Sequence, residues 1–145
     1  MIDLGQYFEL EEYNNEEIIK KIHNKFDLIN LNERVEEYLK GRFSLTTLEE
    51  IYELLHPKMI IVTRGKKGSD FVFQGMKVNK KLENPAKEID PTGAGDAFFS
   101  MFISEYIKNK NKIDLAFIDT TFKKATELTQ KVGKSLGARG HIQTL

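Results

Sequence analysis

The segment at residues 88–102, EIDPTGAGDAFFSMF, combines the residue types that a phosphate site needs. Gly93 and Gly95 allow backbone conformations closed to other residues and let a ligand approach the main-chain N–H groups. The apolar run that follows predicts a helix from about Asp96 to Asn109, and the unpaired N–H groups at a helix start favour anions. Asp96 stands at that start, where a carboxylate either acts as a general base or simply caps the helix.

The predicted helix is apolar around nearly its whole circumference, which indicates burial rather than an amphipathic surface helix. Its apolar residues are Ala97, Phe98, Phe99, Met101, Phe102, Ile103, Tyr106 and Ile107. A carboxylate at the mouth of a buried helix lies in a low-dielectric recess, where its pKa can be tuned for proton transfer.

Two common phosphate motifs are excluded by spacing. The stretch GKKGS lacks the four residues that separate the glycines of a P-loop, and GAGDAF has Phe98 where a dinucleotide fingerprint needs its third glycine. The loops TRGKKGSD and DPTGAGD nevertheless occupy the kind of place where α/β proteins bind ligands, beyond the carboxyl ends of strands.

Composition narrows the class of protein. The chain has 145 residues, which fits one domain at 1–145, and 22 basic residues balance 22 acidic ones. This balance argues against a nucleic-acid or anionic-membrane surface. Cysteine is absent, the three histidines show no metal-ligand spacing, and no apolar run is long enough to span a bilayer. We therefore expect a soluble, cytoplasmic protein with neither nucleic-acid nor membrane partners.

Strands and helices alternate along the chain, which predicts an α/β sandwich with a largely parallel sheet. Strands are expected at the start, at 26–32 and at 58–63, with a β-hairpin near 69–82 that turns at Gln74 and Gly75. Helices are expected at 14–26 with an asparagine cap, at 32–41 closed by Gly41, at 44–55 capped by Thr46 or Thr47 with Glu49 or Glu50 following, at 96–109 and at 115–134.

Four motifs together resemble one family. DPTGAGDAF is similar to the C-terminal signature of the PfkB/ribokinase family of carbohydrate and nucleoside kinases, and IIVTRGKKGSDFVF resembles that family's strand and T-x-G-x-x-G loop. FDLINLNERVEEYLKG resembles its strand ending in Asn-x-x-Glu, followed by a helix, and LGARGHI resembles its closing Gly-Ala segment. The resemblance implies a partial ribokinase-like three-layer sandwich with helices on both faces of the sheet.

The resemblance also implies a reaction, the ATP-dependent transfer of a phosphoryl group to a hydroxyl of a sugar or nucleoside. Asp96 would be the base that takes the proton from the attacking hydroxyl. The backbone of Gly93, Ala94 and Gly95 would form an anion hole for the charge that develops on the transferred group.

The nucleotide and its cations would use other residues. By resemblance, Thr63, Gly65 and Gly68 lie along the ATP. Asp90 and Thr92 belong to a loop that organises a monovalent cation such as K⁺ in many members, and Asp90 is the candidate metal ligand.

Two positions depart from the family pattern. Asn32 begins the Asn-x-x-Glu motif, which helps to hold the Mg²⁺–phosphate network, but the glutamate position is Val35. Glu33 or Glu36 would replace it only with a shifted backbone, because neighbouring helical positions point in different directions. Met101 stands where a small residue is usual, which indicates altered packing more than altered chemistry.

The resemblance covers only the family's C-terminal, ATP-binding half. Nothing in the sequence resembles the family's N-terminal Gly-Gly motif, and IDLG resembles a mid-sheet strand. We therefore expect either a homo-oligomer or a missing N-terminal half that completes the acceptor pocket. An inactive nucleotide-binding or assembly module derived from such a kinase is the alternative function, and a purely structural α/β domain is a third.

Overall fold

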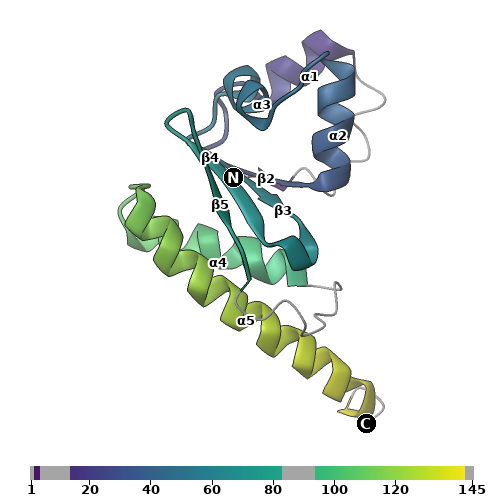
Figure 1. Ribbon diagram of the computed structural model, residues 1–145, viewed down its shortest axis with the longest axis vertical. Coiled ribbons are helices and arrows are strands. Elements are labelled where there is room, and N and C mark those ends of the chain that lie inside the picture. Colours follow the sequence, from purple (N-terminus) through teal and green to yellow (C-terminus); the bar gives the residue numbers. More distant parts are fainter. Residues whose placement is uncertain (1, 4–13, 83–93, 143–145) are drawn as a thin grey trace. The chain divides into compact units, whose positions relative to one another are not determined.

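The computed structural model describes residues 2–3, 14–82 and 94–142, with side chains over residues 97–130 of the last range (Figure 1). The chain divides into two compact units. Residues 1–64 and 68–81 form the first, and residues 65–67 and 82–145 form the second.

The first unit is built on a mixed five-stranded sheet in the order β1-β2-β3-β4-β5 (Figure 1). Its strands are β1 (Ile2–Asp3), β2 (Leu28–Asn32), β3 (Met59–Thr63), β4 (Ser69–Phe73) and β5 (Met76–Lys80). The first three strands pair in parallel and the last two add as an antiparallel hairpin. The expected α/β class, the parallel strands and the hairpin near 69–82 are confirmed.

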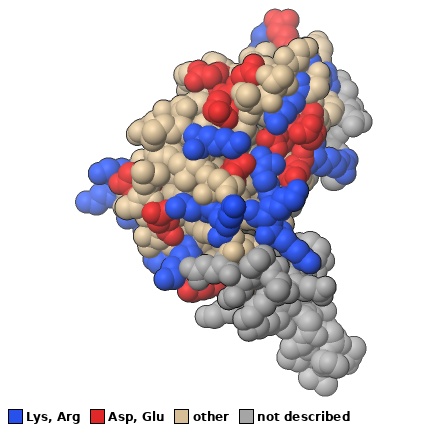
Figure 2. Space-filling model, in the orientation of Figure 1, with Lys and Arg blue, Asp and Glu red and all other residues tan. Residues whose placement is uncertain are grey.

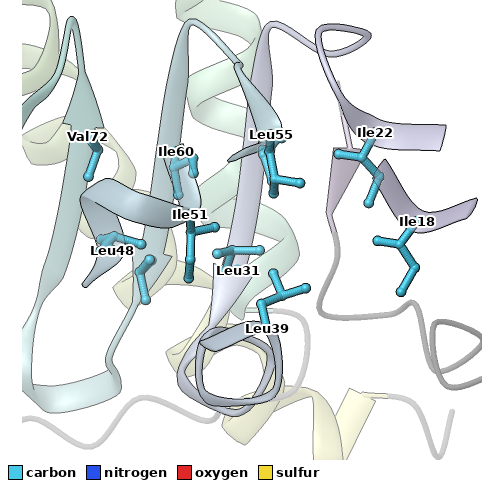
Figure 3. Packing of buried hydrophobic residues seen from close by; sticks show 11 residues of the cluster. Ile18, Ile22, Leu31, Leu39, Leu48, Ile51, Leu55, Ile60 and Val72 are labelled. Carbon is cyan, nitrogen blue, oxygen red and sulfur yellow. The ribbon is translucent and has the colours of Figure 1, made fainter. Parts of the chain in front are cut away.

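Three helices of this unit pack on one sheet face: α1 (Asn15–Ile22), α2 (Glu33–Arg42) and α3 (Leu48–Leu55). Alternate residues of the central strands, Ile29 with Leu31 and Ile60 with Val62, join their apolar residues in one buried cluster (Figure 3). Every one of these four side chains has no exposed surface. The helices therefore hold β2 and β3 through a close-packed apolar layer.

Local signals in the sequence set the helix starts and the hairpin turn. Asn14 caps α1, and Thr47 with Glu50 forms a reciprocal capping box at α3, one of the alternatives expected. Gln74 and Gly75 both have positive φ, of 51° and 75°, as a two-residue hairpin turn of type I′ requires.

The end of α2 differs from the expectation. The helix runs through Gly41 to Arg42, so the prediction that Gly41 closes it was wrong. Ser44 takes the left-handed conformation instead, with φ of 56°, and the N–H of Leu45 donates to the carbonyl of Lys40 at 2.8 Å. This is a Schellman arrangement, in which Leu45 packs against the apolar cluster. The left-handed residue that ends the helix is therefore Ser44, three positions after Gly41.

The second unit pairs α4 (Ala94–Lys108) with α5 (Leu115–Ile142). Phe98 of α4 packs edge to face on Phe122 of α5, with ring centroids 5.9 Å apart. Phe102 packs in the same way on Phe117, with ring centroids 6.1 Å apart. Phe99 and Tyr106 are also buried, in agreement with the prediction, whereas Ile107 is 61% exposed.

Helix α5 is longer than expected. It begins after the capping Asp114, whose Oδ1 accepts the N–H of Phe117 at 2.8 Å, and it continues to Ile142 rather than ending near Lys134. The extension contains glycines but no proline, and a glycine costs only about 1 kcal/mol in a helix.

Charged side chains of both signs occur on the face of the described residues that Figure 2 shows. Basic and acidic side chains lie close together over the face shown in Figure 2. Within the described residues, none of the helices combines the length and the apolar character needed to cross a membrane.

The corrected end of α2 predicts that Gly41→Ala stabilises the protein. Gly41 is an exposed helical residue, and an added Cβ meets no atom within 4 Å. Replacing glycine by alanine there should raise the free energy of unfolding by about 1 kcal/mol in urea titrations. Gly75→Ala is the matched control and should lower it by about 1 kcal/mol, because Gly75 has positive φ. A loss of stability in Gly41→Ala would contradict a helical conformation at Gly41.

Candidate functional site

The parallel pairing of β2 and β3 brings two of the predicted site residues side by side. Asn32 and Thr63 are the last residues of these strands and are register partners. Both are half-buried, and the Thr63 hydroxyl lies 3.5 Å from the Leu31 carbonyl. The structure thus places Asn32 and Thr63 together at the carboxyl edge of the sheet, where α/β proteins bind ligands.

Asn32 already has a structural role at this edge. Its Oδ1 accepts the N–H of Val35 at 2.8 Å and so caps α2. Val35 packs against the apolar cluster of the first unit, which gives a structural reason for an apolar residue at this position.

The segment that follows Thr63 depends on two glycines with positive φ. Gly65 (φ 57°) opens a short 3-10 turn, Gly65–Lys67, and has open space around it. Gly68 (φ 91°) is buried, and a Cβ there would lie 2.0 Å from the Lys80 carbonyl oxygen. The N–H of Arg64 donates to the Gly68 carbonyl at 2.9 Å and closes the turn. The glycine spacing of this loop is therefore required by its backbone geometry.

A buried charge network lies next to this loop, and it was not predicted from the sequence. Arg64 Nη1 and Nη2 donate to the two carboxylate oxygens of Glu36 at 2.8 and 3.0 Å, and its Nε donates to Asp70 Oδ2 at 2.8 Å. The side chains of Glu36 and Asp70 are only 3% and 7% exposed. Asp70 was the available signal in the sequence, because an acid next to the apolar run of a buried strand requires a partner.

The network sets the protonation of its members. Burial by itself raises the pKa of Glu36, but hydrogen bonds and charge from Arg64 and Lys40 outweigh it, and the net pKa is lowered. Burial also opposes ionisation of Asp70, while Asn79 and Arg64 bring its pKa below the ordinary value. The hydrogen bond to Glu36 raises the pKa of Arg64. All three groups are therefore charged at neutral pH.

The start of α2 does not fit a magnesium ligand set. The Asn32 oxygen serves the helix cap, Val35 is apolar, and both Glu36 oxygens are bound by Arg64. The Glu33 side chain is half-exposed, and its Oε2 lies 3.8 Å from Arg64 Nη1. In the part of the chain that the structure describes, no three His, Cys, Asp or Glu residues gather in a way that would hold a metal.

The remaining predicted residues belong to the second unit. Asp90, Thr92 and Gly93 lie outside the described residues. The backbone of Ala94, Gly95 and Asp96 forms the first turn of α4, and their side chains are likewise outside the description.

Comparison with known proteins gives one family. Residues 11–121 match the family model described as pfkB family carbohydrate kinase. A nucleoside kinase of Methanocaldococcus jannaschii is 33% identical over 107 residues, which are 73% of this chain and 33% of that protein. An ATP-dependent 6-phosphofructokinase of Thermoanaerobacterium thermosaccharolyticum is 31% identical over 114 residues, 77% of this chain and 35% of that protein. The chain thus spans about a third of the length of these curated relatives.

Solved structures give the same fold. The crystal structure of the Methanocaldococcus jannaschii nucleoside kinase, described as an archaeal member of the ribokinase family, matches with a TM-score of 0.69 and 26% identity. The match covers 91% of this chain and 40% of that one. A Burkholderia thailandensis nucleoside kinase in complex with inosine matches with a TM-score of 0.66 and 22% identity, over 88% of this chain and 38% of that one. The expected partial ribokinase-like fold is confirmed.

The two loop glycines should differ in their tolerance of a side chain. Gly68→Ala should lower the free energy of unfolding by more than about 2 kcal/mol, because both its φ and the Lys80 carbonyl oppose a Cβ. Gly65→Ala should cost only about 1 kcal/mol, since open space surrounds it. Urea titration of both variants measures the difference, and equal losses would contradict the close approach at Gly68.

The buried network predicts a pH-dependent contribution to stability. Glu36→Gln should lower the free energy of unfolding by about 3 kcal/mol at pH 7, because it leaves Arg64 without its main partner. The ordinary pKa of Glu36 is 4.5 and its folded value is lower, so the carboxylate stabilises fully above pH 4.5. That stabilisation is lost as the pH falls through the folded value.

The difference between wild type and Glu36→Gln should therefore narrow at acid pH. Glu37→Gln is the control, because the neighbouring Glu37 side chain is 74% exposed and should change stability little at any pH. Urea titrations at pH 7 and pH 3 test this. A difference that stays constant between the two pH values would rule out an ionised Glu36.

Proposed function

The chain belongs to the pfkB family of carbohydrate kinases, and we propose that it forms the C-terminal, ATP-binding portion of such a kinase. The reaction is transfer of the γ-phosphoryl group of ATP to a hydroxyl of a sugar or nucleoside. One observation carries this proposal: the family match runs through both the T-x-G-x-x-G loop and the DPTGAGD signature.

In this proposal Asp96 is the general base. It takes the proton from the acceptor hydroxyl as that oxygen attacks the γ-phosphorus, and the backbone N–H groups of Gly93, Ala94 and Gly95 stabilise the charge on the transferred group. The helical backbone of Ala94, Gly95 and Asp96 supports it, because the first N–H groups of a helix have no partner within that helix.

ATP binding is assigned to Thr63, Gly65, Gly68, Thr92 and Asn32. The register between Asn32 and Thr63 and the glycine-dependent loop beside them support this assignment. The amide groups of such a loop can lie close to a phosphate because glycine adds no side chain.

Asp90 is the proposed cation ligand. By the family resemblance, Asp90 and Thr92 would organise a monovalent cation such as K⁺, and Mg²⁺ would lie on the nucleotide phosphates, whose oxygens it prefers. The Mg²⁺ would neutralise charge on the phosphates.

The acceptor is proposed only as a class, a sugar or a nucleoside. The relatives include a nucleoside kinase, a cytidine kinase and a 6-phosphofructokinase. A homo-oligomer or a separate N-terminal half would supply the rest of its pocket. A cytoplasmic location stays a prediction.

The alternative function is an inactive module that binds nucleotide or assembles with a partner. It is favoured by Val35, which packs against the apolar cluster at the position where the family motif has a glutamate.

One pair of measurements on wild type and Asp96→Asn tests the proposal. ATP at about 100 times its Kd should stabilise both proteins by about 2.7 kcal/mol, because the base does not hold the nucleotide. Phosphotransfer to a panel of sugars and nucleosides should fall at least about 100-fold in Asp96→Asn. Asp119→Asn, on the exposed surface of α5, is the control and should retain activity.

The outcomes separate the alternatives. Stabilisation of the wild type without turnover of any acceptor would favour the inactive module. Near-normal turnover in Asp96→Asn would rule out the base assignment, and the absence of any stabilisation by ATP would contradict both functions.

A further inference from the structure

Arg64 is the only residue between Thr63 and the first loop glycine, and its side chain is held by groups outside the loop. All three guanidinium nitrogens donate hydrogen bonds, two to Glu36 on α2 and one to Asp70 on β4. Such charge-assisted, forked bonds fix both the position and the plane of the guanidinium. One loop residue is thus tied to two neighbouring elements of the first unit.

Each carboxylate oxygen in this network has a donor. Besides Arg64, Glu36 Oε2 lies 3.3 Å from Lys40 Nζ, and Asp70 Oδ1 accepts the amide of Asn79 at 2.6 Å. A fully satisfied polar network in a low-dielectric site is rigid and selects one arrangement of its members.

The network restrains both ends of the loop. Arg64 immediately precedes the first loop glycine, and Asp70 lies two residues beyond Gly68. The backbone hydrogen bond from Arg64 to Gly68 closes the same segment. A displacement of the loop would therefore have to break the side-chain pairs and the backbone bond together.

Strand alternation connects the network to Thr63. Val62 lies in the apolar cluster beneath the helices, so the next side chain along β3, Thr63, belongs to the opposite face. The hydrogen bonds of Arg64 to Glu36 on α2 therefore fix the path of the backbone beyond β3. They also keep the Thr63 side chain on the sheet face opposite the helices.

Stability alone does not account for this arrangement. Replacing a buried ion pair by apolar residues of similar volume is often neutral or stabilising, because desolvation offsets the attraction between the charges. What apolar residues cannot supply is a unique geometry for the loop.

We infer that Glu36, Arg64 and Asp70 are positioning residues that hold the loop at residues 63–68 in the conformation that binds the nucleotide. This inference rests on the proposed ATP site, and it gives Glu36 a role other than that of the missing motif glutamate. ATP affinity then depends on two carboxylates that bind Arg64 rather than the nucleotide.

The test is an apolar replacement of the whole network, Glu36→Leu with Arg64→Met and Asp70→Val. This variant leaves no buried charge unpaired, so its urea midpoint should be no lower than that of the wild type. Amide hydrogen exchange at residues 65–68 should become at least 10-fold faster and the Kd for ATP at least 10-fold higher. A merely structural network would leave both quantities unchanged in a variant of equal stability.

The control removes an exposed ion pair on α1, with Glu16→Gln and Lys20→Gln, and should alter neither quantity. Wild-type exchange rates and ATP affinity in the triple variant would overturn the inference. A wild type that fails to bind ATP would overturn the proposed function instead, and the exchange rates would still decide whether the network positions the loop.

If the triple variant does not fold, Arg64→Lys decides by the same measurements. Lysine keeps the charge but cannot bridge both carboxylates, so exchange at residues 65–68 should again accelerate. Unchanged exchange in Arg64→Lys would count against the inference.

Discussion

The parallel pairing of β2 with β3 determines where the candidate nucleotide residues of the first unit lie. Its register makes Asn32 and Thr63 neighbours at the strand ends, and a slip by one residue would turn every side chain of one strand to the opposite face. The apolar layer of α1, α2 and α3 prevents such a slip, because Ile29, Leu31 and their neighbours on β3 are completely buried beneath these helices. The position of this sheet edge is thus set by apolar packing on the face that the helices cover.

Beyond the end of β3, polar interactions rather than apolar packing restrain the backbone. The backbone turns through Gly65 and Gly68, both with positive φ, and the pairs of Arg64 with Glu36 and Asp70 restrain the turn. The two kinds of restraint are complementary, since the glycines permit the turn and the charge network selects one geometry for it. Where the family motif has a glutamate, this chain has Val35, which packs against the apolar cluster, and the neighbouring Glu36 belongs to the charge network.

Features decided within a few residues could be predicted from the sequence. The caps Asn14 and Thr47, the hairpin turn at Gln74 and the strand ending at Thr63 all follow from local residue types. The end of α2 could not, because burial of Leu45 decides between Gly41 and Ser44 as the left-handed residue.

The charge network could not be predicted from local patterns for a similar reason. Glu36 and Arg64 are 28 residues apart, and only the folded sheet brings them together. The stacking of His23 on His56, with ring centroids 5.5 Å apart, was missed in the same way. For Asp96 and the glycines before it, the sequence motif supplies the assignment, because their side chains or backbone lie outside the described residues.

The proposed function requires that this chain binds ATP with residues of the loop at 63–68 and of the glycine signature that includes Gly93 and Gly95. The most direct measurement is NMR titration of the ¹⁵N-labelled chain with ATP. We expect saturable shifts of the amide signals of Gly65, Gly68, Gly93 and Gly95. Saturable shifts confined to other parts of the chain, or no shift at all, would contradict it.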